Sequence, residues 1–493
     1  MKKMNRPAST KSPAPAGAES LLSMEEAIVL LKTTRPTFYR WLKTGKLRGM
    51  KVGRQWRFYR KDVDGFLRGE GLRYDLPVGV EPLLAALRNR IGEKGGSVSS
   101  LSDAEKLEMA SALTIRVGTA LKASDIHLDA VGDTGRLRYR VNGILTVGAE
   151  FDGRLGPALI TRFKAMAKGA VDVHNLPQDY RIRHTVDGAD LDLRMCFLPS
   201  VTGETMTIRI LYPGVASVRL EDLTAGNPVK DALVSAFSAR TGMVIVAGPT
   251  GSGKTSLLYG CVNHLATPQD KVISIEDPVE YAIPGVVQVI VNKNIGLTAA
   301  AALKAVLRSD PNIIVVGEVR DPETADLACK AAMTGHLVLS AMFAKDAANV
   351  LARLMDMGVP PQTLADSLRM VTCQRLVRKV CDACGRKDKP SAELMAWARE
   401  AAPAGGVPWE SVKDLFMKGP GCAKCNGTGF RGRSLVIEWM KVDGEMTAVI
   451  GQGDPAKARA LALKRGMRTM EADAIRQAGE GITSLAEARR ATE

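Results

Sequence analysis

The segment GPTGSGKT at positions 248–255 has the spacing GxxxxGK[ST] of a phosphate-binding loop. It stands between the apolar run Met243–Ala247 and the helix-forming stretch SLLYGCVNHL, so the loop is expected to lead from a strand into a helix. Glycines let backbone N–H groups wrap phosphates, Lys254 supplies a positive charge, and the Thr255 hydroxyl can ligate Mg²⁺. The alternative, a turn that binds nothing, conflicts with these flanks. The positions expected to contact a nucleotide are Gly248, Pro249, Thr250, Gly251, Ser252, Gly253, Lys254, Thr255 and Ser256.

Two acidic stretches follow later apolar runs, IEDPVEY at 275–281 and VVGEVRD at 315–321. Residues at the carboxyl ends of parallel strands face the ligand crevice of such a sheet, although either stretch alone could be a solvated turn. We interpret Glu318 as the group that polarises the attacking water. Glu276, Asp277 and Glu280 are further catalytic candidates that would position water and metal.

Four of the eight cysteines form two CxxC pairs, Cys381 with Cys384 and Cys422 with Cys425, separated by 37 residues. Each pair has a spacing that lets two thiolates share one tetrahedral ion, which predicts a zinc site. Four sulfur ligands leave no open position for water, so the metal is expected to stabilise residues 381–433 and to take no part in catalysis. Chance pairs or a redox pair are the alternatives.

The first 69 residues hold 16 Lys/Arg and 5 Asp/Glu, a surplus of 11 in a chain whose net charge is +15. Residues 21–69 read as a helix over 24–31, a turn, a second helix opened by Thr34, two short strands about Gly53 and a closing helix at 62–67. That order predicts a small winged helix-turn-helix. The candidate contacts to duplex DNA are Arg35, Thr37 and Arg40 on the second helix and Lys51, Arg54 and Arg57 on the wing.

At about 150 residues per domain, 493 residues suggest roughly three domains. Residues 1–20 read as a disordered tail, 70–104 as a linker with an amphipathic helix at about Pro82–Ile91, and 105–212 as an α+β domain. Residues 220–493 alternate buried strands with helices, which is typical of a parallel α/β sheet. No apolar run is long enough for a membrane span and no secretory signal is recognised, so a cytoplasmic protein is expected.

From about Ala104 to Glu493 the chain resembles the secretion ATPases of type II secretion and type IV pilus assembly. The resemblance is carried by the P-loop, the acidic stretches, ASDIHLD at 123–129, RYRVNGIL at 138–145, LRSDPN at 307–312 and TGHLVLS at 334–340. It implies a RecA-like ATPase core in a hexameric ring that uses ATP and Mg²⁺. It also implies an inner-membrane platform protein as partner, and a location at the inner face of the plasma membrane.

The same resemblance assigns further residues. Arg181, Arg194 and Arg209 match arginines of the preceding domain that reach a nucleotide, with plain surface charge as the alternative. His336 matches the first histidine of the family's histidine box and is equally compatible with a structural role. At the box's second histidine this chain has Phe343, which can neither donate to a phosphate nor relay a proton. The four cysteines resemble the element found in assembly and export members.

Residues 21–69 resemble excisionase-like, MerR-type DNA-binding domains, through RPTFYRWLKTGKL and VGRQWRF. A protein-docking role, or contact with acidic lipid headgroups, is the alternative for this basic unit. The favoured function is therefore an ATP-hydrolysing motor that drives pilus or pseudopilus subunit assembly and protein export. The alternative is a DNA-binding regulator or DNA-uptake protein that uses a degenerate ATPase ring as a nucleotide-sensing scaffold.

Overall fold

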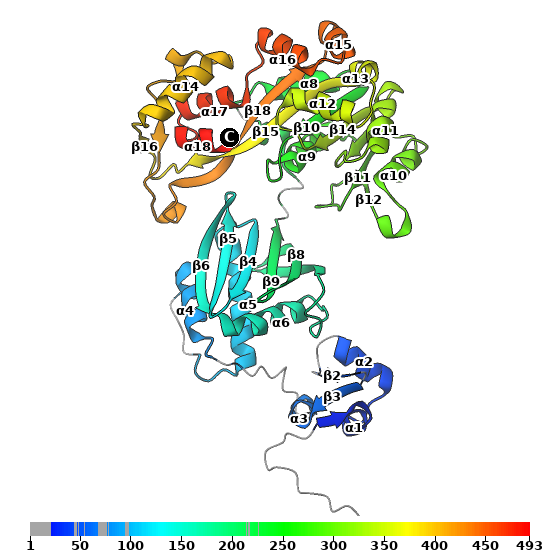
Figure 1. The fold of residues 1–493 in the computed structure, drawn as a ribbon, viewed down its shortest axis with the longest axis vertical. Helices are drawn as coiled ribbons and strands as arrows, with labels where there is room; N and C mark the ends of the chain where they lie inside the picture. Colours follow the sequence, from blue (N-terminus) through cyan, green and yellow to red (C-terminus); the bar gives the residue numbers. More distant parts are fainter. Residues whose placement is uncertain are drawn as a thin grey trace, which may run out of the picture. The chain divides into compact units, whose positions relative to one another are not determined.

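Figure 1 shows the computed structural model, which describes residues 21–43, 47, 49–53, 55–67, 76, 78–93, 98–212, 214, 217–224 and 226–493. The chain divides into two compact units, Met1–Tyr212 and Pro213–Glu493. The expected tail at 1–20 lies outside the described residues, as do Arg54 and the linker positions 70–75, 77 and 94–97. Within the described ranges, no helix is both long and apolar enough to cross a membrane.

The N-terminal part has a three-stranded antiparallel sheet in the order β1-β3-β2. A capping box between Ser23 and Glu26 starts the first helix, and the closing helix follows the last strand directly. Phe38 and Phe58 are fully buried and meet edge to face at 5.1 Å, which ties the second helix to the sheet. These elements make the predicted winged helix-turn-helix: β1 (Leu21–Ser23), α1 (Met24–Leu30), α2 (Arg35–Lys43), β2 (Met50–Val52), β3 (Gln55–Tyr59) and α3 (Arg60–Leu67).

A six-stranded antiparallel sheet in the order β6-β5-β4-β9-β8-β7 forms the α+β part. Successive side chains of each strand point to opposite faces of the sheet. One face is apolar and packs on three helices, while the other face carries polar and charged side chains. The elements are α4 (Glu81–Arg90), α5 (Asp103–Ala120), β4 (Asp125–Val131), β5 (Thr134–Val141), β6 (Ile144–Asp152), η1 (Gly153–Leu155), α6 (Gly156–Met166), β7 (Gln178–Val186), β8 (Ala189–Ser200) and β9 (Gly203–Leu211).

The second unit is built on a seven-stranded sheet in the order β12-β11-β13-β14-β10-β15-β18. All neighbouring strands are parallel except β15 and β18. Because its central strands are buried on both faces, they read as continuous apolar runs, as predicted. The strands are β10 (Gly242–Ala247), β11 (Val272–Glu276), β12 (Val286–Ile290), β13 (Ile313–Val316), β14 (Leu337–Met342), β15 (Leu368–Val380) and β18 (Phe430–Lys441).

Helices cover both faces of this sheet. One apolar cluster joins α7 (Leu220–Leu223), α8 (Val229–Phe237) and α9 (Lys254–Leu265) to one face. The other face packs on α10 (Ala299–Val306), α11 (Pro322–Met333), α12 (Ala347–Asp356) and α13 (Pro361–Ser367). The remaining elements are η3 (Lys293–Ile295), β16 (Arg386–Lys387), α14 (Ala392–Ala404), η4 (Trp409–Ser411), β17 (Met417–Lys418), η5 (Ala423–Cys425), α15 (Gly444–Gly451), α16 (Pro455–Lys464), α17 (Met470–Gly479) and α18 (Leu485–Thr492).

Candidate functional site

The glycine-rich loop leaves the carboxyl end of β10 and enters α9, as its sequence predicts. Gly248 has φ +146°, and a Cβ there would lie 2.5 Å from the carbonyl oxygen of Gln374, so only glycine fits this close approach. Gly253 caps α9 with φ +87°. The loop thus lies at the N-terminus of a helix of 12 residues, where free N–H groups and the helix dipole favour a phosphate.

Lys254 folds back onto this loop. Its Nζ donates to the carbonyl oxygens of Gly248 at 2.8 Å and Pro249 at 3.0 Å. The same Nζ lies 4.1 Å from the centroid of the Phe343 ring. Burial lowers the pKa of Lys254, and the carboxylate of Glu318 opposes that shift. The lysine is therefore held by its own chain at the place where phosphates are expected.

A cleft of about 340 Å³ opens beside the loop, at the carboxyl ends of β11 and β13. Four of the predicted acidic side chains line it together with Thr255, so the fold brings the helix start and both acidic stretches to one place. Such a group of carboxylates and a hydroxyl has the hard oxygen ligands that Mg²⁺ prefers. The acidic residues are Glu276, Asp277, Glu280 and Glu318.

Glu318 is held by a residue that sequence reasoning did not select. Its Oε2 accepts from Nε and Nη2 of Arg320, both at 2.5 Å. Nη1 of Arg320 lies 3.7 Å from Asp277, so one guanidinium spans both acidic stretches. The other oxygen of Glu318, Oε1, is buried and has no hydrogen-bond partner among the described residues. The position of Arg320, two residues after Glu318, is the feature of the sequence that could have predicted this ion pair.

Glu276 differs from its neighbours, because its carboxylate is satisfied by side chains of the same unit. Oε2 accepts from the Tyr259 hydroxyl at 2.6 Å, and Oε1 accepts from Ser274 at 2.6 Å and Gln288 at 3.0 Å. Only 6% of the residue is exposed. This arrangement ties β11, α9 and β12 together, and the carboxylate faces these donors.

His336 does not join this group. It precedes β14, and its carbonyl oxygen accepts from the N–H of Gly242 at the first residue of β10. The P-loop lies at the opposite end of these strands, six residues or about 20 Å away. The imidazole Nδ1 lies 3.1 Å from the carbonyl oxygen of Ala331.

The three predicted arginines are neighbours across the six-stranded sheet. Arg181 faces Arg194, which faces Arg209, and the row continues to Asp125. They share one face, because directly opposed residues in antiparallel strands point to the same side. Arg209 pairs with Asp125 at 3.0 Å, and Arg181 with Asp192 at 3.3 Å. The fold therefore assembles a basic row from three separate strands.

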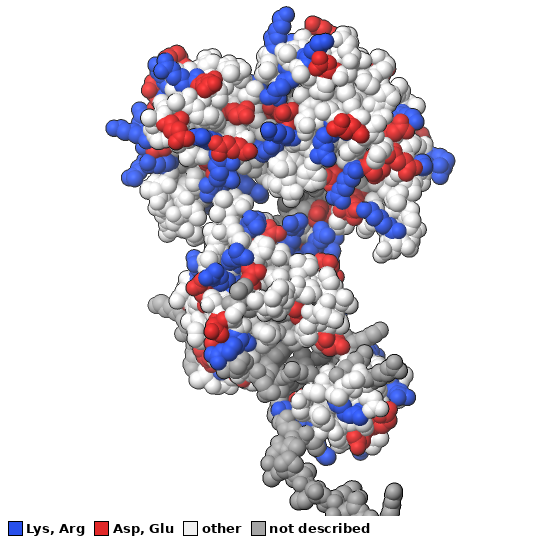
Figure 2. Space-filling view, in the orientation of Figure 1, with Lys and Arg blue, Asp and Glu red and all other residues white. Residues whose placement is uncertain are grey.

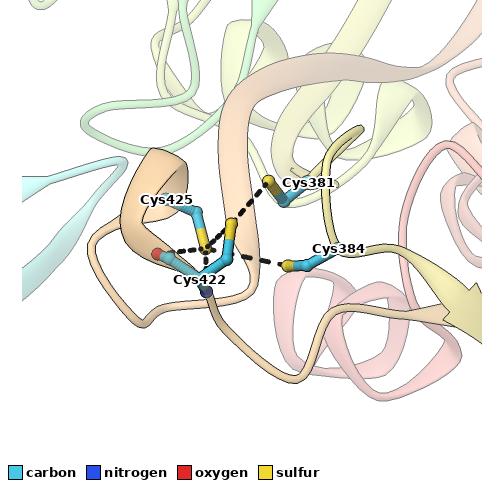
Figure 3. A group of neighbouring side chains, drawn as sticks. All are labelled: Cys381, Cys384, Cys422 and Cys425. Carbon is cyan, nitrogen blue, oxygen red and sulfur yellow. Dashed lines mark hydrogen bonds between the residues drawn. The ribbon is translucent and has the colours of Figure 1, made fainter.

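The two CxxC pairs meet at the end of the antiparallel strands β15 and β18, as Figure 3 shows. The sulfurs lie within 4.8 Å of one another, with neighbouring pairs at 3.7, 3.9 and 3.9 Å. A tetrahedral ion with Zn–S bonds of about 2.3 Å requires sulfur separations of about 3.8 Å. Cys381, Cys384, Cys422 and Cys425 therefore have the geometry of a four-sulfur metal site.

Backbone contacts prepare this cluster. The N–H groups of Cys422 and Gly429 donate to Cys425 Sγ at 3.1 and 3.2 Å. Although burial opposes it, these bonds lower the pKa of the Cys425 thiol to about 6. The segments before and after the Cys422–Cys425 turn approach closely, because a Cβ on Gly429 would lie 2.1 Å from the carbonyl oxygen of Gly419.

The predicted DNA contacts fall on two elements of the N-terminal part. Arg35 begins α2 and pairs with Glu25 at 3.0 Å, and the Thr37 hydroxyl accepts from Thr34 at 3.0 Å. Arg40 is exposed on α2, and Arg57 on β3 donates to Gln55 at 2.5 Å. Lys51 belongs to β2, but its side chain lies outside the described residues.

In the second unit, basic and acidic side chains are interspersed over the face seen in Figure 2.

The parallel sheet, the P-loop and the converging carboxylates define a P-loop ATPase. Comparison with known proteins agrees. The profile of the family described as Type II/IV secretion system protein matches residues 101–490, and that of the Helix-turn-helix domain matches residues 21–71. The chain therefore belongs to the type II/IV secretion system protein family, and the predicted helix-turn-helix at its N-terminus is also confirmed.

Individual relatives support the assignment. The chain is 38% identical over 372 residues to the type II secretion system protein HxcR of Pseudomonas aeruginosa, covering 75% of this chain and 74% of the relative. It is 38% identical over 375 residues to the type IV pilus assembly ATPase PilB of Thermus thermophilus, covering 76% of this chain but only 41% of the relative. The structure of the Legionella pneumophila ATPase DotB has the same fold, with a TM-score of 0.55 at 20% identity, over 77% of this chain and 94% of that one.

Proposed function

We propose that this protein is the ATP-hydrolysing motor of a type II secretion or type IV pilus system, driving pilus or pseudopilus subunit assembly and protein export. The observation that carries the proposal is the convergence of Lys254, Thr255 and Glu318 at one edge of the parallel sheet. The similarity to proteins named for type II secretion and pilus assembly supports the choice of system.

Each residue of the site has a separate role in this proposal. The N–H groups of the loop bind the phosphates, and Lys254 exchanges its loop carbonyls for phosphate oxygens. The Thr255 hydroxyl and nearby carboxylates would hold Mg²⁺, which supplies charge neutralisation. Glu318 orients and polarises the attacking water, for which its buried Oε1 is the oxygen not bound to Arg320.

The protein is proposed to work as a hexameric ring at the inner face of the plasma membrane, with an inner-membrane platform protein as partner. The basic row of Arg181, Arg194 and Arg209 is suited to neutralising phosphate charge in such an assembly. His336 is then a family position whose role is independent of Lys254, given its place at the other end of β14.

The four cysteines are proposed to hold one zinc ion. Four thiolates close the coordination sphere, so the ion would stabilise the junction of β15 and β18 and would leave no position for substrate. Metal content, measured by elemental analysis of the purified protein, tests this role; one zinc per chain is expected.

A second function is duplex DNA binding by residues 21–69. It is favoured by the exposed Arg35 and Arg40 on α2 and by Arg57 on the adjacent strand. If phosphates are bound there, the logarithm of the affinity falls linearly with the logarithm of salt concentration. Fluorescence anisotropy with a labelled duplex measures this dependence. An affinity that does not change with salt concentration would argue against DNA binding and favour a protein partner. DNA binding without turnover would favour the regulator or DNA-uptake function.

Steady-state ATP hydrolysis by the purified protein tests the leading proposal, with Lys254→Ala as the blank. Removing the ammonium takes away the charge that binds phosphate, so turnover is expected to fall to background. Equal rates in the two proteins would reject this site. ATP binding without turnover would favour a nucleotide-sensing scaffold over a motor.

A further inference from the structure

Phe343 lies where β14 meets the phosphate-binding loop. It follows Met342, the last residue of the strand, whose carbonyl oxygen accepts from the N–H of Gly248 at 3.2 Å. The side chain belongs to none of the buried apolar clusters of the described residues, and 36% of the residue is exposed. A phenyl ring at this position is therefore not explained by core packing.

The ring contacts the charged group of the site. Lys254 Nζ lies 4.1 Å from its centroid, well within the distance of a cation–π interaction. An ammonium group has three N–H donors, and two of them bond to the carbonyl oxygens of Gly248 and Pro249. The face of the Phe343 ring covers a further side of this ammonium group.

Three side-chain contacts hold the backbone around Phe343. Nη1 of Arg353 donates to the carbonyl oxygen of Phe343 at 2.5 Å, and Nη2 of Arg375 donates to that of Lys345 at 3.2 Å. The thiol of Cys373 lies 3.5 Å from the carbonyl oxygen of Ala344. Because Cys373 and Arg375 belong to β15, the segment that carries the ring is braced by a strand that lies beyond β10 in the sheet.

We propose that Phe343 restrains Lys254 in the nucleotide-free protein and thereby weakens the capture of ATP. The inference rests on the proposed nucleotide site. Phosphates must draw the ammonium away from its carbonyls, and an ammonium neutralised by phosphate gains less from a π face. The ring therefore stabilises the empty site more than the occupied one, and it is a positioning residue that acts through Lys254.

Substitutions of Phe343 distinguish the effect of the aromatic ring from the effect of side-chain size. Phe343→Leu keeps an apolar side chain but removes the ring, whereas Phe343→Tyr keeps the ring. Leu415→Ala is the matched control, because Leu415 is an exposed apolar residue of the same unit at 58% exposure and lines no part of the site. The measurements are the Kd for a fluorescent ATP analogue with Mg²⁺, the KM and kcat for ATP, and thermal melting to confirm folding.

Phe343→Leu is expected to bind the analogue about fivefold more tightly, the equivalent in affinity of a partly desolvated cation–π contact. KM should fall similarly while kcat changes less, and Phe343→Tyr and Leu415→Ala should stay within about twofold of the parent. Unchanged or weaker binding by a folded Phe343→Leu variant, with normal binding by the parent, would overturn the restraint and leave the ATPase proposal intact. If the parent protein itself binds no analogue, both proposals fall.

Discussion

Glu487 on the last helix, α18, anchors the end of β15 that leads to the cysteine cluster. Its side chain is fully buried and accepts from Arg378 Nη2 at 2.7 Å and from Arg490 Nε at 2.7 Å. Arg490 Nη2 donates a further bond at 2.6 Å, and the Arg378 backbone N–H donates one at 3.1 Å. Burial alone would raise the pKa of Glu487, but the two guanidinium groups lower it from 4.5 to about 2.

The size of this contribution follows from proton linkage. A depression from 4.5 to about 2 corresponds to about 3 kcal/mol of folding stability at pH 7. Arg490 is 48% exposed, so solvent screening reduces this to about 2 kcal/mol. Glu487→Gln removes the charge and leaves Arg378, which is 18% exposed, without its counter-ion. The variant is therefore expected to lose about 2–3 kcal/mol at neutral pH.

The sign of the pH dependence is fixed by the direction of the shift. Because the folded pKa lies below the unfolded one, the contribution is complete above about pH 5 and is lost as pH falls towards about 2. Urea unfolding followed by the fluorescence of Trp397, Trp409 and Trp439 in the second unit measures it. The gap between parent and Glu487→Gln should be full at pH 7 and should shrink to less than half of that value at pH 3.

A matched control lies directly after the same helix. Glu493 pairs with Arg489 at 2.6 Å, but the carboxylate is 63% exposed, so Glu493→Gln should cost no more than about 0.5 kcal/mol. Equal losses in the two variants, or a loss for Glu487→Gln that does not change with pH, would refute this reasoning.

Three further predictions concern the two sites. Glu318→Gln is expected to bind ATP with near-parental affinity and to lose at least about 100-fold in kcat, because an amide cannot polarise the water as a carboxylate does; normal turnover would remove Glu318 from the chemistry. Cys381→Ser should lose bound zinc and lower the melting temperature, and full metal content by elemental analysis would contradict a four-sulfur site. Tyr259→Phe deprives the buried Glu276 of a donor at 2.6 Å and should cost about 1–3 kcal/mol by chemical denaturation, while an unchanged midpoint would show that the bond does not stabilise the unit.

Local sequence signals were sufficient for much of the fold. The runs Met243–Ala247 and Ile313–Val316 lie in buried parallel strands, because a strand covered on both faces must be apolar throughout. The loop at 248–255 lies between β10 and α9, since its glycines specify positive φ angles at defined positions. Where a structural feature depends only on nearby residues, residue type and spacing are enough to predict it.

Contacts between distant segments were not predictable in this way. His336 and Phe343 are seven positions apart in sequence, yet β14 separates them, and only Phe343 contacts Lys254. The sequence made Glu276 a catalytic candidate equal to Asp277, but its donors come from α9, β11 and β12. Which oxygen faces a cleft depends on three elements at once, and no spacing rule encodes it.

The nucleotide site and the cysteine cluster both depend on the strand β15. Gln374 in its middle donates to the carbonyl oxygen of Ser252 in the phosphate-binding loop at 2.7 Å. Four residues later Arg378 bonds to Glu487, and Cys381 follows directly after the strand. β15 pairs with β10 from Leu368 to Cys373 and with β18 from Met370 to Val380, so one strand runs from the P-loop to the cysteine cluster. The loss of Glu487 should therefore loosen the support of Cys381 before it disturbs Lys254, because the bond that it removes lies on the cysteine side of Gln374.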